Sequence, residues 1–418
     1  MASTAICIVR AVASSPLKSG RSSDAVRMHR VRLSCGGALL ALGACAQLPP
    51  LDTGTGAALS GCSTETASIS FDFEGAPPSH CTIEGEREFS VLVSPEHAPP
   101  INPSPWYAFR YQANGSENVV VHLRYLAAKH RYRPKWQSAI HMKVLDASLH
   151  DDGRTATLSL PPGEAVVSGQ ELIGTKEYAS LMARLDRSAA VTRETLGRSH
   201  GGRPIEALRI GEPTAPKLVI LLGRQHPPEV SGAIAMEHFL ETLVALADAG
   251  KFDAQDMQVL AVPLLNPDGV ARGHWRANLG GEDINRDWGS FAQPETRSVA
   301  QWLDRLPSQI RPVVMVDFHS TSRNLFYVQG DEASADQERF MARWLGGKEH
   351  LIAGYPFAIE RRNANPGTGT AKNWFHATHG IPAYTYEVGD ETDRQAIAQA
   401  ARELATSLVE VLPRSGLP

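Results

Sequence analysis

The chain has 418 residues, of which 42% are hydrophobic and 21% are charged, and its formal net charge is -4. This composition is ordinary for a globular protein, and the length suggests about two domains. The small net charge offers no basic surface, which excludes nucleic acid as an expected partner.

The first 45 residues have the features of a bacterial secretory leader. A basic stretch, Met28-His-Arg-Val-Arg, precedes an apolar run over residues 33–44, which ends in Leu42-Gly-Ala-Cys45. This pattern is typical of a lipoprotein signal, which is cleaved before the cysteine and lipidated on its thiol. Residues 1–27 lack such a pattern, so Met28 could be the true translation start. The alternative is a buried apolar segment with a chance cysteine.

We therefore expect a leader over 1–45, a flexible Ala-, Pro-, Gly-, Thr- and Ser-rich tether over 46–65, and a periplasmic protein anchored to the membrane at Cys45. In the oxidising periplasm, Cys62 and Cys81 would remain available for a disulfide.

Residues 66–175 have the pattern of an all-β domain. Short alternating or aromatic segments suit strands, and they cover residues 68–73, 89–93, 106–111, 119–125, 141–145 and 155–160. Asn114-Gly115 and Asp151-Asp-Gly153 are turn signals between such strands. The spacing predicts an antiparallel β-sandwich, and its sequence shows no cluster of catalytic side chains.

Residues 176–418 alternate between apolar runs and helical patterns. The runs predict strands over residues 218–222, 257–263, 313–318 and 383–388. The helical patterns cover residues 178–185, 233–246, 295–306, 337–345 and 392–412. This alternation predicts an α/β domain with a largely parallel or mixed sheet, whose active site lies at the carboxyl ends of the strands.

Four polar stretches fall at the ends of these predicted strands. They are His226-Pro-Pro-Glu229, Asn266-Pro-Asp-Gly269 with the following Arg276 and Gly281-Glu-Asp-Ile-Asn-Arg-Asp-Trp288, Asp317-Phe-His-Ser320, and Tyr384-Thr-Tyr-Glu387. Imidazole and carboxylate groups are ligands that zinc accepts.

In this order the four stretches resemble the zinc metallocarboxypeptidase family, which has the fold of carboxypeptidases A and B. They resemble most its cytosolic carboxypeptidase branch, which trims C-terminal glutamates. The resemblance implies a mixed-sheet catalytic domain preceded by a β-sandwich. It also implies one zinc ion, bound by His226, Glu229 and His319.

The resemblance also implies roles for other residues. Glu387 would be the general base and acid, and Arg276 would face the carbonyl oxygen of the cleaved bond. Asn285 and Arg286 would bind the free terminal carboxylate of a peptide substrate. The chemistry suits these roles, since a carboxylate carries protons, a guanidinium stabilises an oxyanion, and its planar fork matches a carboxylate.

Each of these residues also has a structural interpretation. His319 could be a satisfied interior histidine, and Asp317 could support it or merely cap the strand. Arg286 could pair with Asp283 or Asp287, and Glu387 could pair with a nearby arginine or lysine.

Substrate preference is expected to depend on Thr370-Ala-Lys372, which resembles the Thr-Ala-Arg segment of the glutamate-trimming branch. Lys372, helped by Arg323, would favour an acidic C-terminal residue, although both could be solvated surface charges. The sequence departs from the carboxypeptidase A type because residues 360–369 contain no tyrosine; Asn363 or Asn365 stands there.

Two alternative functions stay open. One is an N-acyl amino acid amidohydrolase of the aspartoacylase type, which shares the zinc scaffold. The other is a non-catalytic binding lipoprotein of the cell envelope, in which the β-sandwich would carry the function.

Overall fold

The computed structural model describes residues 61–98, 101–361 and 368–414. All of them belong to one compact unit, Gly54–Pro418, and the other unit is Met1–Thr53. The predicted leader, the anchor at Cys45 and most of the tether therefore lie outside the described residues.

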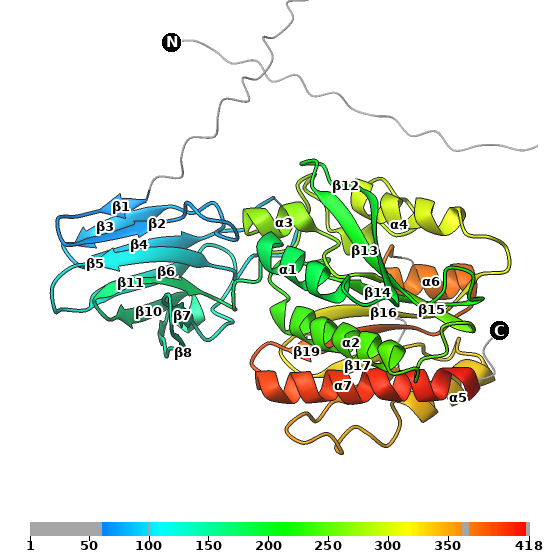
Figure 1. The fold of residues 1–418 in the computed structure, drawn as a ribbon. Helices are drawn as coiled ribbons and strands as arrows, with labels where there is room; N and C mark the ends of the chain where they lie inside the picture. Colours follow the sequence, from blue (N-terminus) through cyan, green and yellow to red (C-terminus); the bar gives the residue numbers. More distant parts are fainter. Residues whose placement is uncertain (1–60, 99–100, 362–367, 415–418) are drawn as a thin grey trace, which may run out of the picture. The chain divides into compact units, whose positions relative to one another are not determined.

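Residues 61–168, the N-terminal β-region, form two sheets (Figure 1). The six-stranded sheet has the order β1-β2-β5-β11-β7-β8, and the five-stranded sheet has the order β3-β4-β6-β10-β9. Alternate side chains of both sheets are buried in one hydrophobic cluster that includes Phe89, Phe109, Val121 and Leu158. The strands are β1 (Cys62–Ser63), β2 (Ala67–Ser70), β3 (Cys81–Gly85), β4 (Glu88–Val93), β5 (Ala108–Ala113), β6 (Val119–Tyr125), β7 (Lys135–Gln137), β8 (Met142–Val144), β9 (Ser148–His150), β10 (Thr155–Leu160) and β11 (Gly163–Ser168).

The pairing in this region differs from the sequence prediction in two respects. Strands β4 and β6 are parallel, so the purely antiparallel prediction is wrong at that pair. Asn114-Gly115 also closes no hairpin, because β5 pairs with β2 and β11 while β6 pairs with β4 and β10. A turn signal reverses the chain but does not decide whether the next strand joins the same sheet. The Asp151–Gly153 turn does join two paired strands, β9 and β10.

The two sheets are also joined covalently. The expected disulfide is present between Cys62 in β1 and Cys81 in β3, with a Cα–Cα distance of 5.8 Å. These strands are the first in their respective sheets, so the bond links one edge of each sheet.

The rest of the chain is built on an eight-stranded mixed sheet of order β12-β13-β15-β14-β16-β19-β17-β18. Its central strands, β15, β14, β16 and β19, are parallel to their neighbours in that group. Parallel strands that are covered on both faces consist of consecutive apolar residues. Residues 218–222 of β14 fit this rule, since all of them are buried. The predicted mixed α/β fold is therefore confirmed. The strands are β12 (Val191–Arg198), β13 (Pro204–Ile210), β14 (Lys217–Gly223), β15 (Met257–Val262), β16 (Arg311–Thr321), β17 (Leu325–Val328), β18 (Ala358–Arg361) and β19 (Ala383–Gly389).

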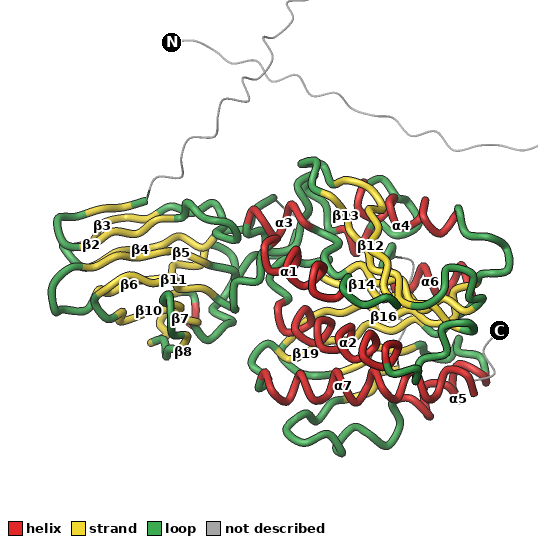
Figure 2. Tube along the Cα trace, in the orientation of Figure 1, coloured by secondary structure: helices red, strands yellow, loops and turns green. Residues whose placement is uncertain are grey.

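Helices cover both faces of this sheet (Figure 2). One core includes side chains of α1, α2, α5 and α7, and a second includes side chains of α4 and α6. Helix α2 is long and apolar enough to cross a membrane by composition alone, but it packs against β16 and α7 as a core helix. The helices are α1 (Thr175–Leu185), α2 (Val230–Asp248), α3 (Pro267–Arg272), α4 (Pro294–Asp304), α5 (Ala335–Trp344), α6 (Ala371–His379) and α7 (Arg394–Val411), with 3-10 turns η1 (Asp151–Gly153), η2 (Ile284–Arg286) and η3 (Leu412–Arg414).

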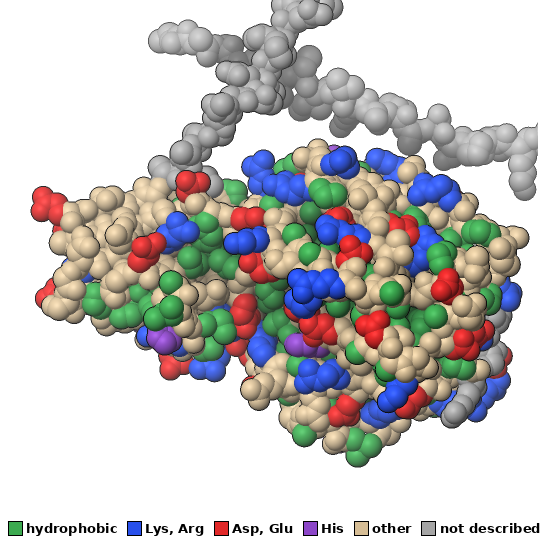
Figure 3. Space-filling model, viewed as in Figure 1, with side chains coloured by type: hydrophobic (Ala, Val, Ile, Leu, Met, Phe, Trp, Pro, Cys, Tyr) green, Lys and Arg blue, Asp and Glu red, His purple; other side chains and the backbone are tan. Residues whose placement is uncertain are grey.

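Acidic and basic side chains are interspersed over the molecular face shown in Figure 3. This mixture agrees with the small net charge of the sequence.

Candidate active site

Two histidines and one glutamate converge where β14 and β16 end. The chain leaves β14 at Gly223 and passes His226 before Glu229, the residue just before helix α2, while His319 lies in the neighbouring strand β16. The ligating atoms of the three residues all lie within 4.8 Å of one another. The Nδ1 atoms of His226 and His319 lie 2.8 and 2.7 Å from the two oxygens of Glu229. Within the described ranges, no other group of three or more such side chains converges in this way.

The other nitrogen of each imidazole is held by a buried carboxylate. Nε2 of His226 lies 3.0 Å from Asp283, and Nε2 of His319 lies 2.7 Å from Asp317. Carboxylates in this position orient a metal-binding histidine and increase its basicity. Asp317 therefore supports His319 rather than merely capping the strand.

The charges at this cluster suit a cation. Burial alone would raise the pKa of Glu229, but His226 and His319 hold it well below its usual range. Burial alone would lower the pKa of His319, but Asp317 and Glu229 together raise it well above its usual value. Three convergent nitrogen and oxygen donors leave one tetrahedral position open, so the residues present fit a zinc ion.

Glu387 lies beside this cluster. Strand β19 is parallel to β16, and Glu387 stands in register with His319, so the two residues are neighbours across adjacent strands. Its Oε2 atom is buried without a hydrogen-bond partner, and no described lysine or arginine forms an ion pair with it. The ion-pair interpretation of Glu387 is therefore wrong. The pKa of Glu387 is raised to about 7, mainly by burial and also by the charge of Glu229, although His319 and His226 act in the opposite direction.

Asp283 also orients Arg276. The Nε atom of Arg276 donates to the second oxygen of Asp283 at 2.6 Å, and both side chains are less than one-fifth exposed. Burial alone would raise the pKa of Asp283, but His226, Arg276 and Arg286 lower it well below its usual range. From the sequence, Asp283 was only a candidate partner of Arg286, although its place two residues before Asn285 was visible in the motif.

Asn285 and Arg286 lie in the short turn η2. Asn285 accepts a hydrogen bond from the backbone of Ala371 at 2.9 Å, which ties η2 to the start of α6. The Arg286 side chain is 40% exposed and lies 3.9 Å from Asp283, at the outer limit of an ion pair. Asp287 instead accepts hydrogen bonds from Ser290 and Thr296. Arg286 is therefore only weakly engaged by the acids proposed as its structural partners.

All of the predicted site residues line one cleft of about 230 Å³. Lys372 is only 3% exposed there, so the surface-charge interpretation is wrong for this residue. Arg323, in contrast, is exposed and pairs with Glu360, which agrees with a surface role. Arg131 and Trp275 also line the cleft. Arg131 was not predicted from the sequence, because no motif in the β-region indicated an active-site residue.

The Asn266-Pro-Asp-Gly269 stretch connects two loops of the site. Asn266 accepts a hydrogen bond from the backbone of Gly269 and caps helix α3. Its amide group donates to the backbone carbonyl groups of Gln225 and Ala277, at 3.1 and 3.2 Å. Since these residues adjoin His226 and Arg276, the motif fixes two loops of the site relative to each other.

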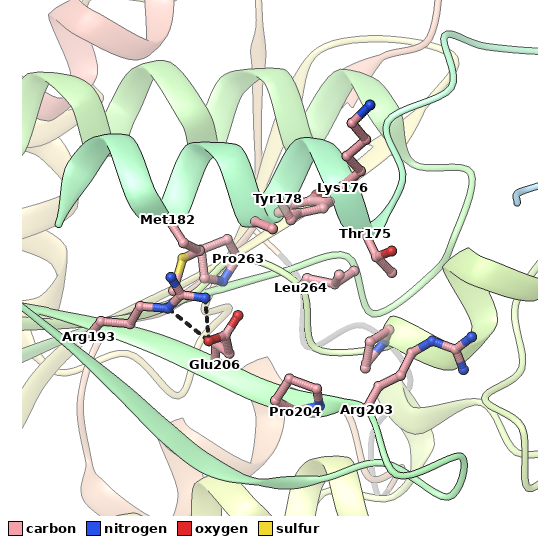
Figure 4. A pocket seen from close by; sticks show the side chains of 12 residues that line it. Thr175, Lys176, Tyr178, Met182, Arg193, Arg203, Pro204, Glu206, Pro263 and Leu264 are labelled. Atoms are coloured by element: carbon pink, nitrogen blue, oxygen red, sulfur yellow. Dashed lines mark hydrogen bonds and ion pairs between the residues drawn. The ribbon is translucent and has the colours of Figure 1, made fainter.

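A larger cavity, of about 430 Å³, lies elsewhere and is bordered by α1, β12 and β13 (Figure 4). Three of its charged side chains are in ion pairs, with Arg193 bound to Glu206 and Arg203 bound to Asp268. Because its lining holds no convergent ligating groups, size alone does not identify the reactive site.

Comparison with known proteins agrees with this geometry. The sequence profile of the family described as zinc carboxypeptidase matches residues 178–407, more than half of the chain. The matched segment contains the three convergent ligands and Glu387.

Curated relatives include cytosolic carboxypeptidase 2 of Xenopus tropicalis, which is 29% identical over 43% of this chain. Cytosolic carboxypeptidase 6 of Mus musculus is 28% identical over 47% of it. The aligned segment spans only 20% of the first relative and 39% of the second. A metallo-carboxypeptidase structure from Burkholderia cenocepacia shares the fold, with a TM-score of 0.72 and 17% identity over 84% of this chain and 99% of that one.

Proposed function

This chain belongs to the zinc carboxypeptidase family, and from that premise we propose that it is a zinc-dependent metallocarboxypeptidase that hydrolyses the C-terminal peptide bond of peptides. The observation that carries the proposal is the convergence of His226, Glu229 and His319 beside Glu387, whose Oε2 atom is buried without a hydrogen-bond partner. When bound by these three residues, zinc would supply the Lewis acidity that makes water acidic and polarises a carbonyl group.

Glu387 would carry the proton of the reaction. A carboxyl with a pKa raised to about 7 can accept a proton from water and return it to the departing amine at neutral pH. Its position in register with His319 keeps it next to the metal ligands without an intervening salt bridge.

Arg276 would stabilise the oxyanion that develops on the attacked carbonyl group. Its ion pair with Asp283 holds the guanidinium in one orientation before substrate binds, so little reorganisation is needed during the reaction. Asp283 thereby couples the orientation of Arg276 to that of the ligand His226.

Asn285 and Arg286 would bind the free C-terminal carboxylate of the substrate. The guanidinium of Arg286 offers a planar pair of donors, and its 40% exposure leaves it accessible from the cleft. Recognition of a terminal carboxylate at a fixed distance from the metal would restrict cleavage to the last peptide bond.

We further propose a preference for acidic C-terminal residues. Lys372 is buried in the wall of the cleft, and an acidic side chain that reaches it would gain a charge-assisted hydrogen bond in a partly desolvated site. Release of C-terminal Glu should therefore exceed release of Lys or Phe from otherwise identical peptides. A preference for Lys or Phe would contradict this proposal.

The aspartoacylase-type alternative predicts a different substrate. An amidohydrolase of that type would prefer an N-acetyl amino acid to a peptide with the same C-terminal residue. We expect the peptide to be hydrolysed faster, and the reverse order would favour the alternative.

We propose that residues 66–175 form a β-sandwich domain separate from the catalytic domain, residues 176–418, because the two sheets of this segment share one core. The lipoprotein motif supports a periplasmic enzyme anchored through Cys45. Incorporation of labelled fatty acid into the wild type, and its loss in Cys45→Ala, would test the anchor.

The central experiment compares zinc-loaded wild type with Glu387→Gln on a panel of peptides. The variant should bind zinc with unchanged stoichiometry and lose turnover, because only the proton-carrying group is altered. Retained turnover would refute the role of Glu387, and a fully folded wild type that binds no zinc would favour the non-catalytic alternative.

A further inference from the structure

One residue that lines the active-site cleft comes from the N-terminal β-region. Arg131 lies in the connection between β6 and β7, yet it borders the same cleft as His226, Glu229 and Glu387. Its side chain is 30% exposed, so part of the guanidinium is accessible to a ligand.

The guanidinium of Arg131 is held in a fixed position. Its Nε and one terminal nitrogen lie 2.9 and 2.7 Å from the same oxygen of Asp390. The group also lies over the rings of Tyr132 and Trp275, at 5.1 Å from each ring centre. Asp390 immediately follows β19, the strand that carries Glu387, so Arg131 is positioned relative to the reacting groups.

Other residues of the β-region hold the same turn. Lys135, which is 3% exposed, binds the carboxylate of Glu391 at 2.7 and 2.9 Å. Just beyond β11, Gln170 donates to the backbone carbonyl of Asp390 at 3.2 Å. Several polar interactions therefore hold this part of the chain against the turn after β19. The position of Arg131 at the cleft does not depend on one surface side chain.

The remaining donors of Arg131 indicate what it would bind. A guanidinium has five N–H groups, and two are directed to Asp390. In the part of the chain that the structure describes, no protein acceptor is recorded for the others. Because Asp390 already matches the charge of Arg131, these donors suit a neutral oxygen, such as a peptide carbonyl, better than a second carboxylate.

The position of Arg131 indicates which part of the substrate it would meet. A carboxypeptidase places only one residue beyond the cleaved bond, and Asn285, Arg286 and Lys372 would bind that residue. The rest of the peptide must leave along another wall. Arg131 and Trp275 lie in other segments of the lining, the β6–β7 connection and the loop before Arg276, whereas those three residues lie in η2 and α6.

We propose that Arg131 is a substrate-binding residue that donates to the first peptide carbonyl oxygen upstream of the cleaved bond. The β-region would thus complete the substrate site of the α/β domain. This inference depends on the proposed carboxypeptidase function.

The experiment compares two N-acylated substrates with the same C-terminal amino acid, chosen as the one the wild type prefers. The N-acetylalanyl derivative carries the upstream carbonyl, and the propionyl derivative lacks it. In Arg131→Gln, kcat/KM should fall roughly tenfold or more for the first substrate, as expected for loss of a hydrogen bond from a charged donor. For the propionyl derivative it should stay within about twofold of wild type.

Arg131→Lys keeps a cation beside Asp390 but lacks the additional forked donors, so it should fold normally and show the same selective loss. The matched control is Arg133→Gln, which removes an exposed charge from the same connection and should leave both substrates unaffected. Equal losses on both substrates would overturn the inference, because they would indicate a structural role. Zinc-loaded wild type that cleaves neither substrate would instead remove the carboxypeptidase premise, and the inference with it.

Discussion

Replacement of Asp283 by asparagine tests the central electrostatic arrangement of the site. The oxygen that accepts from Nε2 of His226, at 3.0 Å, can be retained by the amide. The oxygen that accepts from Arg276, at 2.6 Å, becomes an NH₂ group, so a donor faces a donor. The variant therefore changes the group that orients the ligand His226. It also removes the carboxylate that pairs with the guanidinium of Arg276, which is only 17% exposed.

Both consequences can be given a magnitude. Loss of one partner of a largely buried ion pair costs about 3 kcal/mol, so metal-free Asp283→Asn should unfold with a free energy lower by about that amount. A neutral amide also supports His226 less well than a carboxylate, and changes of this kind weaken metal binding roughly 10- to 100-fold. That loss corresponds to about 1.4–2.7 kcal/mol of zinc binding free energy.

Urea unfolding of metal-free protein measures the first effect, and competition with a chromophoric zinc chelator measures the second. Glu206→Gln is the matched control, since it breaks the partly exposed ion pair with Arg193 outside the site. This control should cost at most about 1 kcal/mol and leave zinc affinity unchanged. If Asp283→Asn bound zinc within twofold of wild type, the proposed support of His226 by Asp283 would be refuted.

Three further predictions concern protonation and stability. Glu387 must be ionised to accept a proton and its pKa is raised to about 7, so kcat/KM should fall tenfold per pH unit on the acid side. Since bound zinc favours the carboxylate, the midpoint of this limb should lie at or below about 7, and a higher midpoint would contradict the assignment. Because the pKa of His319 is raised well above its usual value, zinc binding to metal-free protein at neutral pH should release about one proton. Calorimetry in buffers of different ionisation enthalpy would detect this proton, and its absence would argue against a protonated His319. Cys62→Ala should destabilise the β-region by about 3 kcal/mol, because the lost disulfide closes a loop between residues separated by 19 positions, while zinc affinity stays unchanged. Equal stability of wild type and variant in chemical unfolding would show that the bond contributes nothing.

Periodicity was sufficient to predict the four central strands of the α/β part, β14, β15, β16 and β19, but not the outer strands of that sheet. The apolar run at residues 218–222 became β14 because a strand covered on both faces needs consecutive apolar side chains. Strand pairing in the β-region was not predictable in the same way. Whether β5 and β6 share a sheet depends on which distant strands flank them, and their local alternation is the same in either case.

The order of residues along the chain placed reactive groups at the strand ends, and this order was enough to indicate the family and to name His226, Glu229, His319 and Glu387. How these groups interact became visible only in the folded molecule. The 2.6 Å contact between Arg276 and Asp283, the burial of Lys372 and the entry of Arg131 into the cleft all depend on distances between segments remote in the chain. Such distances are set by packing of the whole molecule, and no local spacing of residues encodes them.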